Sequence, residues 1–473
     1  MNIMNLTKRS LVAACITFTL GACSVSPKSV LFAADISPAL NKEQSPKNII
    51  MLVGDGMGPA YTTAYRYFTD DPETTEVEQT VFDRLLVGMS STHPAQGSGY
   101  ITDSAAAATA LATGVKSYNG AISVDTNKQP VETVLERAKK QGKKTGVVVT
   151  SQVNHATPAS YLTHNESRKN YDAIANSYID EGIKADVIFG GGWQYFIRDD
   201  RNLVNEFTSA GFHYINNPEA LKTLPPQKPI LGLFADVALP WALDDVHKNR
   251  LSAMTKAATK QLENDRGYFL LIEASQIDWA GHSNDIASAM AEMDDLAKTM
   301  EYLEQYVEDH PDTLVVLTAD HSTGGFSIAA NGKYEWDPKV LRTMKHSPQK
   351  IAQNFVSTEL TIQAISKQLN FVVTKQEVAI LKRVKDQTLE KLKEFNMLNN
   401  ASKQQQAKPN VEEAIYIAVK KLLDIRTNSG WTTSGHTAVD VPVFAMGAGS
   451  KQFQGKLDNT DIAKKIFSLL GKH

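Results

Sequence analysis

Residues 48–54 have the sequence Asn-Ile-Ile-Met-Leu-Val-Gly, a near-continuous apolar run that ends in glycine. Such a run is typical of a strand that is buried on both faces of a sheet. Helical patterns, as at 131–140 and 251–264, lie between this run and others like it. The alternation predicts an α/β fold with a mostly parallel central sheet flanked by helices on both faces. The similar runs cover residues 145–150, 268–272, 313–318 and 441–446.

Two parts of the chain depart from this alternation. Residues 183–232 contain Gly190-Gly191-Gly192 and Pro225-Pro226, which predict an irregular insertion. Residues 337–430 are rich in Lys and Gln and mainly helical in pattern, which predicts a helical insertion before the last strand. We therefore expect one domain at 47–473 that carries both insertions.

The overall composition excludes some classes of protein. Of the 473 residues, 42% are hydrophobic and 21% are charged, which is typical of a globular protein and argues against disorder. The formal net charge is -3, so nothing in the charge balance indicates a nucleic-acid partner.

The N-terminus has the features of an export signal. Lys8 and Arg9 precede an apolar stretch at 11–20 that is too short to span a bilayer. The following Leu-Gly-Ala-Cys, which ends at Cys23, resembles a bacterial lipobox. We therefore predict a lipoprotein-type signal peptide at 1–23, a lipid anchor on Cys23, and a location in the periplasm or cell envelope. The alternative is cleavage near Ala33-Ala34, which releases a soluble exported protein.

The same export prediction bears on the cysteines and on the segment that follows. The sequence has two cysteines, Cys15 in the signal and Cys23, so we expect the mature protein to lack a disulfide. Residues 24–46 are polar and contain proline and serine, which is typical of a tether.

Acidic residues and histidines follow several of the predicted strands, close to where each strand ends. Because ligands in open α/β sheets bind at the carboxyl ends of the strands, we expect these side chains to gather at one edge. The adjacent Asp320 and His321 suit zinc, because they combine a carboxylate oxygen with an imidazole. Taken alone, each of these short polar segments is also consistent with an ordinary turn. The residues are Asp55 after 48–54, His155 and Thr157 after 145–150, Glu273, Asp278 and His282 at or after the end of 268–272, and Asp320 and His321 after 313–318.

Two patterns, the pair Asp278 and His282 and the lone His436, are ambiguous when each is taken alone. Asp278 and His282 are four residues apart, so on a helical turn they face the same side and suit chelation, but such pairs are common by chance. His436 lies in a loop of small residues before the last predicted strand. A lone histidine is usually structural, and His436 becomes a ligand candidate only beside the others.

Ser104 begins a run of alanines with high helix propensity. Asp103 or Ser104 is therefore a candidate for a plain N-cap. The functional alternative places the Ser104 hydroxyl at a helix N-terminus, where free N–H groups and the helix dipole favour phosphate. No Gly-x-Ser-x-Gly elbow surrounds this serine, so a metal is the activator that the sequence offers.

Six segments together resemble the alkaline phosphatase family, in the family's order and from about residue 47 to 449. The resemblance implies an alkaline-phosphatase-like fold and hydrolysis of phosphate monoesters through a phosphoserine on Ser104, with release of inorganic phosphate and an alcohol. The segments are 53–58 (VGDGMG), 102–106 (TDSAA), 155–158 (HATP), 273–278 (EASQID), 319–325 (ADHSTGG) and 435–437 (GHT).

The resemblance also implies a metal content of two Zn²⁺ and one Mg²⁺ per subunit, in a homodimer. Arg168 matches the family's phosphate-binding arginine, whose planar guanidinium grips two phosphate oxygens, and Asp103 would orient it. The implied ligands are Asp278, His282 and His436 for one zinc, Asp55, Asp320 and His321 for the second zinc with Ser104 beside it, and Asp55, Thr157 and Glu273 for magnesium.

Two positions depart from the best-known bacterial pattern, which has Asp in place of His155 and Lys in place of Trp279. Without that carboxylate the third site has less negative charge nearby, and without that lysine the bound phosphate loses a positive neighbour. We therefore expect weaker magnesium retention and faster phosphate release. For Trp279, simple packing is an equal alternative.

Other functions compete with this interpretation. A phosphodiesterase of the same superfamily would usually have threonine as its nucleophile and lack the counterpart of Arg168. A sulfatase needs Pro and Arg after the modified residue, whereas Ser104 is followed by alanines. A non-catalytic periplasmic protein that binds zinc or phosphate is a further alternative, although no expected ligand is missing.

Overall fold

The computed structural model describes residues 45–471, without the side chains of residues 401 and 402. The predicted signal peptide at 1–23, the lipid anchor at Cys23 and nearly all of the predicted tether at 24–46 lie outside the described residues. Within 45–471, every helix is too short or too polar to cross a membrane.

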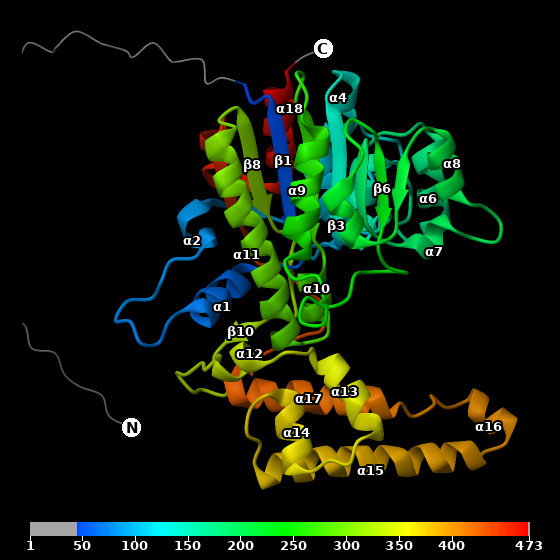
Figure 1. Cartoon of the computed structure of the whole chain (residues 1–473), viewed down its shortest axis with the longest axis vertical. Helices are drawn as coiled ribbons and strands as arrows, with labels where there is room; N and C mark the ends of the chain where they lie inside the picture. The colour runs from blue at the N-terminus through cyan, green and yellow to red at the C-terminus, as the bar shows by residue number, and fades with distance from the viewer. Residues whose placement is uncertain (1–44, 472–473) are drawn as a thin grey trace, which may run out of the picture. The chain divides into compact units, whose positions relative to one another are not determined.

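A ten-stranded sheet forms the centre of the described region (Figure 1). In spatial order its strands are β14 (Gly455–Asp458), β2 (Leu86–Ser91), β13 (Val441–Gly447), β8 (Thr313–Thr318), β1 (Asn48–Gly54), β7 (Tyr268–Ala274), β3 (Lys144–Gln152), β4 (Val187–Gly191), β6 (Ile230–Leu233) and β5 (His213–Ile215). Central β1 pairs in parallel with β7 and β8. Only β13 runs against the other strands of this sheet, antiparallel to both β8 and β2. The predicted mostly parallel α/β sheet is therefore confirmed.

Helices cover both faces of the sheet, which explains why the 48–54 run has no polar face. Ile49, Met51 and Val53 pack on one face, and Ile50 and Leu52 pack on the other. Burying each such side chain contributes roughly 1.5–3 kcal/mol. The first face carries α3 (Ser104–Thr113), α4 (Val134–Lys140), α5 (Ala156–Leu162), α6 (Tyr171–Asp180), α7 (Trp193–Phe196), α8 (Leu203–Ser209) and α18 (Asn459–Leu470). The second carries α1 (Pro59–Thr69), α2 (Val81–Leu85), α9 (Arg250–Leu262), α10 (Gln276–His282) and α11 (Ile286–Asp309).

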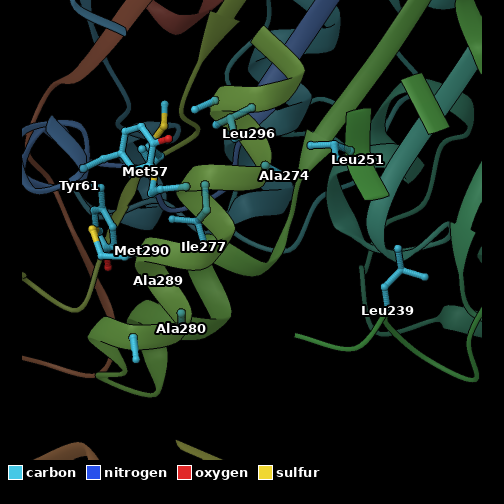
Figure 2. Packing of buried hydrophobic residues seen from close by; sticks show 14 of the residues in the cluster. Met57, Tyr61, Leu239, Leu251, Ala274, Ile277, Ala280, Ala289, Met290 and Leu296 are labelled. Atoms are coloured by element: carbon cyan, nitrogen blue, oxygen red, sulfur yellow. The ribbon is translucent and has the colours of Figure 1, made fainter. Parts of the chain in front are cut away.

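The packing of α1 against α10 and α11 supports the end of the sheet where the polar residues gather. Figure 2 shows Met57 and Tyr61 beside Ile277 and Met290, and all four side chains are buried. The Tyr61 hydroxyl donates a hydrogen bond to the Thr323 carbonyl at 2.8 Å. This apolar cluster therefore also anchors the loop that follows β8.

Residues 183–232, for which we expected an irregular insertion, supply β4, β5 and most of β6 to the central sheet. The glycines that indicated a loop have another cause. A Cβ on Gly191 would lie 2.1 Å from the Val237 carbonyl oxygen, so this position of β4 has room only for glycine. A short 3₁₀ helix, η2 (Pro218–Thr223), completes the connection between β5 and β6.

Residues 337–430 are helical, as their pattern indicates. We call residues 339–427 the helical layer; it lies at the lower end of the view in Figure 1, where α17 contacts α11. Its helices are α12 (Lys339–Thr343), α13 (Pro348–Ser357), α14 (Ile362–Leu369), α15 (Lys375–Met397), α16 (Asn400–Gln404) and α17 (Val411–Thr427). The strand at 441–446 is not the last one, because β14 and α18 follow β13.

Two small antiparallel pairs and two 3₁₀ turns complete the described chain. Strand β9 (Ser322–Thr323) pairs with β12 (His436–Thr437), and β10 (Ser327–Ile328) pairs with β11 (Ser429–Gly430). These pairs bring the chain on either side of the helical layer together beside the sheet. The turns are η1 (Gln96–Ser98) and η3 (Ser450–Phe453).

Candidate active site

The acidic residues and histidines do gather at the carboxyl edge of the parallel strands. Asp55 follows β1, Glu273 lies near the end of β7, and Asp320 and His321 follow β8. Because β1 pairs in register with both neighbours, these three strand ends lie side by side. His155 and Thr157 reach the same place from the segment between β3 and α5.

His436 reaches this edge because of strand direction. It precedes β13, and a residue that precedes a parallel strand would lie at the opposite edge of the sheet. Since β13 is antiparallel to β8, its first residues lie where β8 ends. The β9–β12 pair then sets His436 opposite Thr323.

Three residues form what we call the outer cluster: Asp278, His282 and His436. Asp278 and His282 lie on one turn of α10, with Nε2 of His282 3.3 Å from Asp278 Oδ2. The Nε2 atoms of His282 and His436 are 3.1 Å apart. Each residue therefore offers one ligand atom to a common point, and the His282 side chain is 42% exposed.

The inner cluster consists of Asp55, Asp320 and His321, which are all fully buried. His321 Nε2 lies 3.4 Å from Asp55 Oδ1 and 3.1 Å from Asp320 Oδ2. Gly56 permits this closeness: its φ is +72°, and a Cβ there would lie 2.7 Å from both Asp278 Cα and Thr323 Oγ1. The outer and inner clusters can therefore lie close together because residue 56, between them, has no side chain.

A third group of possible ligands surrounds the other side of Asp55. It comprises Asp55, His155 and Glu273, with Thr157 buried nearby. Burial raises the pKa of Glu273 to about 7. Its Oε2 accepts a hydrogen bond from Ser275 at 2.6 Å, which leaves Oε1 as the free oxygen.

The chemistry of these donors fits bound metal ions. Both carboxylate oxygens of Asp55, Glu273 Oε1, Thr157 Oγ1 and Asp320 Oδ2 are buried and have no hydrogen-bond partner within the described chain. Burial, followed by the charge of Asp320, raises the pKa of Asp55 well above its usual range. Buried carboxylates without partners are costly, and a cation among them removes that cost.

Backbone carbonyls and Thr323 orient the three imidazoles. Nδ1 of His282 donates to the Ser434 carbonyl, and Nδ1 of His436 donates to the Thr102 carbonyl at 2.9 Å. Thr323 Oγ1 lies 3.2 Å from Nδ1 of His321 and donates to Asp278 Oδ1. Such partners fix the ring so that Nε2 faces a metal. We assigned Thr323 no role from the sequence, although it lies in the ADHSTGG segment.

Ser104 and Asp103 share the N-terminus of α3. Asp103 is the N-cap and its side chain accepts from the Ala106 N–H at 3.0 Å, so Ser104 is the first helical residue. The buried Ser104 Oγ lies 3.1 Å from His321 Nε2. The serine hydroxyl therefore stands at the inner cluster and at a helix N-terminus at once.

Arg168 lies between Asp103 and His155. Its Nη1 donates to Asp103 Oδ2 at 3.1 Å, and its Nη2 donates to His155 Nε2 at 3.1 Å. Burial, and then the charge of Arg168, lower the pKa of His155 to about 3, so this imidazole is neutral at ordinary pH. The Trp279 ring stands edge-on to His155 with ring centroids 6.0 Å apart. Every residue predicted for the site thus lies within one connected group.

Comparison with known proteins agrees with this geometry. A family model described as Alkaline phosphatase matches residues 46–471. This chain belongs to the alkaline phosphatase family. Like its family, it is a metal-dependent enzyme that hydrolyses phosphate monoesters.

Several alkaline phosphatases resemble the chain over nearly its full length. Alkaline phosphatase 4 of Bacillus subtilis is 44% identical over 431 residues, which cover 90% of this chain and 88% of that protein. Alkaline phosphatase 3 of the same organism is 40% identical over 472 residues, 98% of this chain and 97% of that protein. The crystal structure of a cold-active alkaline phosphatase from the psychrophile Shewanella sp. is 51% identical with a TM-score of 0.81, and covers 90% of this chain and 100% of that one.

Proposed function

We propose that Ser104 is the nucleophile of this alkaline phosphatase and that the reaction passes through a phosphoserine at Ser104. The observation that carries this proposal is the position of the Ser104 hydroxyl, 3.1 Å from His321 Nε2 and at the N-terminus of α3. Free N–H groups and the dipole at a helix N-terminus favour a phosphate there. The serine and the place for its phosphate thus coincide.

Arg168 is proposed to bind the phosphate. Its guanidinium is held by Asp103 and His155, which fixes its plane before substrate arrives. A planar guanidinium that donates two hydrogen bonds suits a phosphate and its developing negative charge. The neutral His155 adds no charge to compete with that interaction.

The clusters are proposed to hold two Zn²⁺ and one Mg²⁺ per subunit. The outer cluster, Asp278, His282 and His436, would hold one zinc, and the inner cluster, Asp55, Asp320 and His321, the other. Asp55, Thr157 and Glu273 would hold magnesium. When bound, such ions lower the pKa of a hydroxyl or water and stabilise an oxygen that becomes negatively charged. The outer cluster would serve the departing alcohol oxygen, because the inner cluster is already beside Ser104.

We also propose that the enzyme is exported to the periplasm or cell envelope, with a lipid anchor at Cys23, and that it works as a homodimer. The positive residues, short apolar stretch and lipobox-like sequence at 8–23 support export and anchoring. Membership of the family supports the dimer.

Hydrolysis of p-nitrophenyl phosphate at alkaline pH tests the site assignment. We would compare the mature chain, the same protein stripped with a chelator and refilled with zinc and magnesium, Ser104→Ala, and the exposed control Ser209→Ala. We expect activity that needs metal, is lost in Ser104→Ala and is kept in the control. Acid quenching followed by mass spectrometry should place the phosphate on Ser104. Full activity of Ser104→Ala would refute the assignment of Ser104 as the nucleophile. A preference of the unaltered enzyme for bis-p-nitrophenyl phosphate would favour the diesterase alternative.

A further inference from the structure

A groove of about 860 Å³ opens beside His282, between the end of α10 and the helical layer. Its walls come from His282 to Asn284, from the side of α17, and from the segment 429–432. Of the two clusters described above, the inner one is fully buried, whereas the His282 side chain of the outer one is 42% exposed. His282 belongs both to the outer cluster and to the lining of the groove, so the groove begins at the solvent-facing residue of that cluster.

The walls of this groove are held in place by polar contacts. The Lys420 ammonium donates to the Ser283 carbonyl, next to His282. The Tyr416 hydroxyl donates to Asp285 at 3.1 Å, and the Asn284 amide donates to the Thr433 carbonyl at 2.9 Å. The first two bonds join α17 to the residues that follow α10, and the third joins the same residues to the segment that precedes β12. Because these bonds form without a ligand, the groove is preformed, which reduces the ordering cost of binding.

The lining of the groove is polar but has little net charge. Glu413 and Asp424 supply two carboxylates, and Lys420 and Lys421 supply two ammonium groups that interact with them. Asn284, Asn331 and Thr432 add uncharged donors and acceptors.

Two aromatic side chains, Tyr416 and Trp431, contribute to this lining, and the Lys420 ammonium lies 4.0 Å from the centroid of the Tyr416 ring. Trp431 faces the groove, and its Nε1 is already bound to Asp424 at 2.9 Å. The indole packs against Phe326, with ring centroids 4.8 Å apart, and the part of the ring that lines the groove is apolar. A surface of this kind beside many hydrogen-bonding groups suits a molecule with several hydroxyls and C–H faces, better than an alkyl chain or a second anion.

We propose that this groove receives the alcohol group of the phosphate ester and that it favours polyhydroxy alcohols, as in sugar phosphates. The proposal rests on the proposed function, in which the departing oxygen faces the outer cluster. The substituent on that oxygen then extends past His282 toward solvent, where the groove lies. Arg168 and Ser104 hold only the phosphate, so discrimination between esters falls to this groove.

Steady-state kinetics with two esters separates the groove from the phosphate site. Glucose 6-phosphate fills the groove, phenyl phosphate carries an apolar group of similar reach, and inorganic phosphate as an inhibitor has no alcohol. Thr432→Val and Lys421→Ala remove polar groups from the lining, and Ala330→Trp fills the space. Lys382→Ala on α15, outside the groove lining, is the matched control. All comparisons use the metal-loaded full mature protein.

The ratio of kcat/KM for glucose 6-phosphate to that for phenyl phosphate should fall about fivefold in Thr432→Val and in Lys421→Ala, the loss expected for one hydrogen bond. It should fall further in Ala330→Trp and stay constant in Lys382→Ala. Calorimetry on the Ser104→Ala background should show the same weakening for binding of glucose 6-phosphate. The inhibition constant of inorganic phosphate should stay within about twofold, since one lost alcohol contact leaves the phosphate contacts intact.

An unchanged ratio in all three groove variants would overturn the proposal. A parallel loss for both esters and for inorganic phosphate would overturn it too, because it would show that the residues shape the outer cluster and not an alcohol subsite. Failure of the underlying site assignment gives a different result: Ser104→Ala would then keep its hydrolytic activity in every background.

Discussion

The carboxylate of Asp103 serves Arg168 with one oxygen and helix α3 with the other. Oδ2 accepts from Arg168 Nη1 at 3.1 Å, and Oδ1 accepts from the N–H groups of Ala106 and Gly120, each at 3.0 Å. Asp103, the residue before the proposed nucleophile, thus stabilises the helix that carries Ser104. It also fixes the Arg168 guanidinium, which is proposed to bind the phosphate. A single side chain couples local helix stability to phosphate binding.

Substitution of Asp103 should separate these two tasks. Asp103→Ala should lower the free energy of unfolding by about 1 kcal/mol through loss of the N-cap, whereas Asp103→Asn should keep most of the cap. Both variants should raise the inhibition constant of inorganic phosphate several-fold, because Arg168 loses its charged partner. Thermal melts and phosphate inhibition of each variant measure the two effects. Unaltered phosphate inhibition in both would contradict the coupling.

Substitutions of His155 and Trp279 should change metal retention and product release. His155→Asp places a negative charge beside Arg168 and near Asp55 and Glu273, so magnesium should be retained longer during dialysis. Trp279→Lys adds a positive charge near the same place, so inorganic phosphate should inhibit more strongly. Metal analysis after dialysis and product-inhibition constants test the pair, with Trp193→Lys, a partly exposed tryptophan on α7, as the control. Magnesium retention and phosphate-inhibition constants equal to those of the unaltered protein would contradict both predictions.

Removal of metal should destabilise the protein, and one substitution should reverse that effect. Chelation leaves the Asp55 carboxylate buried beside Asp320 and Glu273, and zinc at about a hundred times its dissociation constant should restore roughly 2.7 kcal/mol. In the chelated state Asp55→Asn should melt at a higher temperature than the unaltered chain, because one of several acidic groups buried together is gone. The same variant should gain less from added metal. A lower melting temperature for chelated Asp55→Asn than for the chelated unaltered chain would contradict the prediction that Asp55 destabilises the metal-free protein.

The partly buried pair of Glu136 and His164 should make stability depend on pH. Their side chains are 3.0 Å apart. Although burial opposes both charges, this bond raises the pKa of His164, and the same bond, the Thr133 N–H and Lys184 lower the pKa of Glu136 to about 2. The His164 share of the stability is present below its ordinary pKa of about 6.5 and is lost as pH rises through the raised value. The Glu136 share is present above about pH 4.5 and is lost as pH falls toward 2.

Glu136→Gln should therefore cost more stability at pH 5.5, about 1–2 kcal/mol, than at pH 9. Glutamine keeps the capping box with Thr133, so the comparison isolates the charge. The control is Glu132→Gln, whose partners Arg137 and Lys140 stay charged across this range. Its cost should be the same at both pH values. An equal cost for Glu136→Gln at pH 5.5 and pH 9 would exclude a charged His164.

The sheet was predictable because burial on both faces leaves a clear pattern. Each residue from Ile49 to Val53 packs on one of the two faces of the sheet, both of which are covered by helices, so the whole stretch is apolar. The site residues were predictable for a related reason, since parallel strands must bring Asp55, Glu273 and Asp320 to one edge. Both inferences need only strand periodicity and the carboxyl-end rule.

Other features leave no such pattern. The composition of 441–446 does not reveal that β13 is reversed, although this alone explains how His436 reaches the site. A glycine required by close packing, such as Gly191, looks the same in the sequence as a glycine in a turn. The carbonyls of Thr102 and Ser434 orient two histidines, but any residue type supplies a carbonyl.

The strand order also dictates when this enzyme becomes complete during synthesis. β2 lies near the start of the described chain, yet both of its neighbours, β13 and β14, come from residues 441–458. His436, the last of the proposed ligands along the chain, arrives with them. A ribosome-bound chain that lacks its final residues therefore holds an unpaired β2 and an outer cluster without His436. Loop closure over such distances is slow, so the catalytic centre should assemble only after the whole chain has been made.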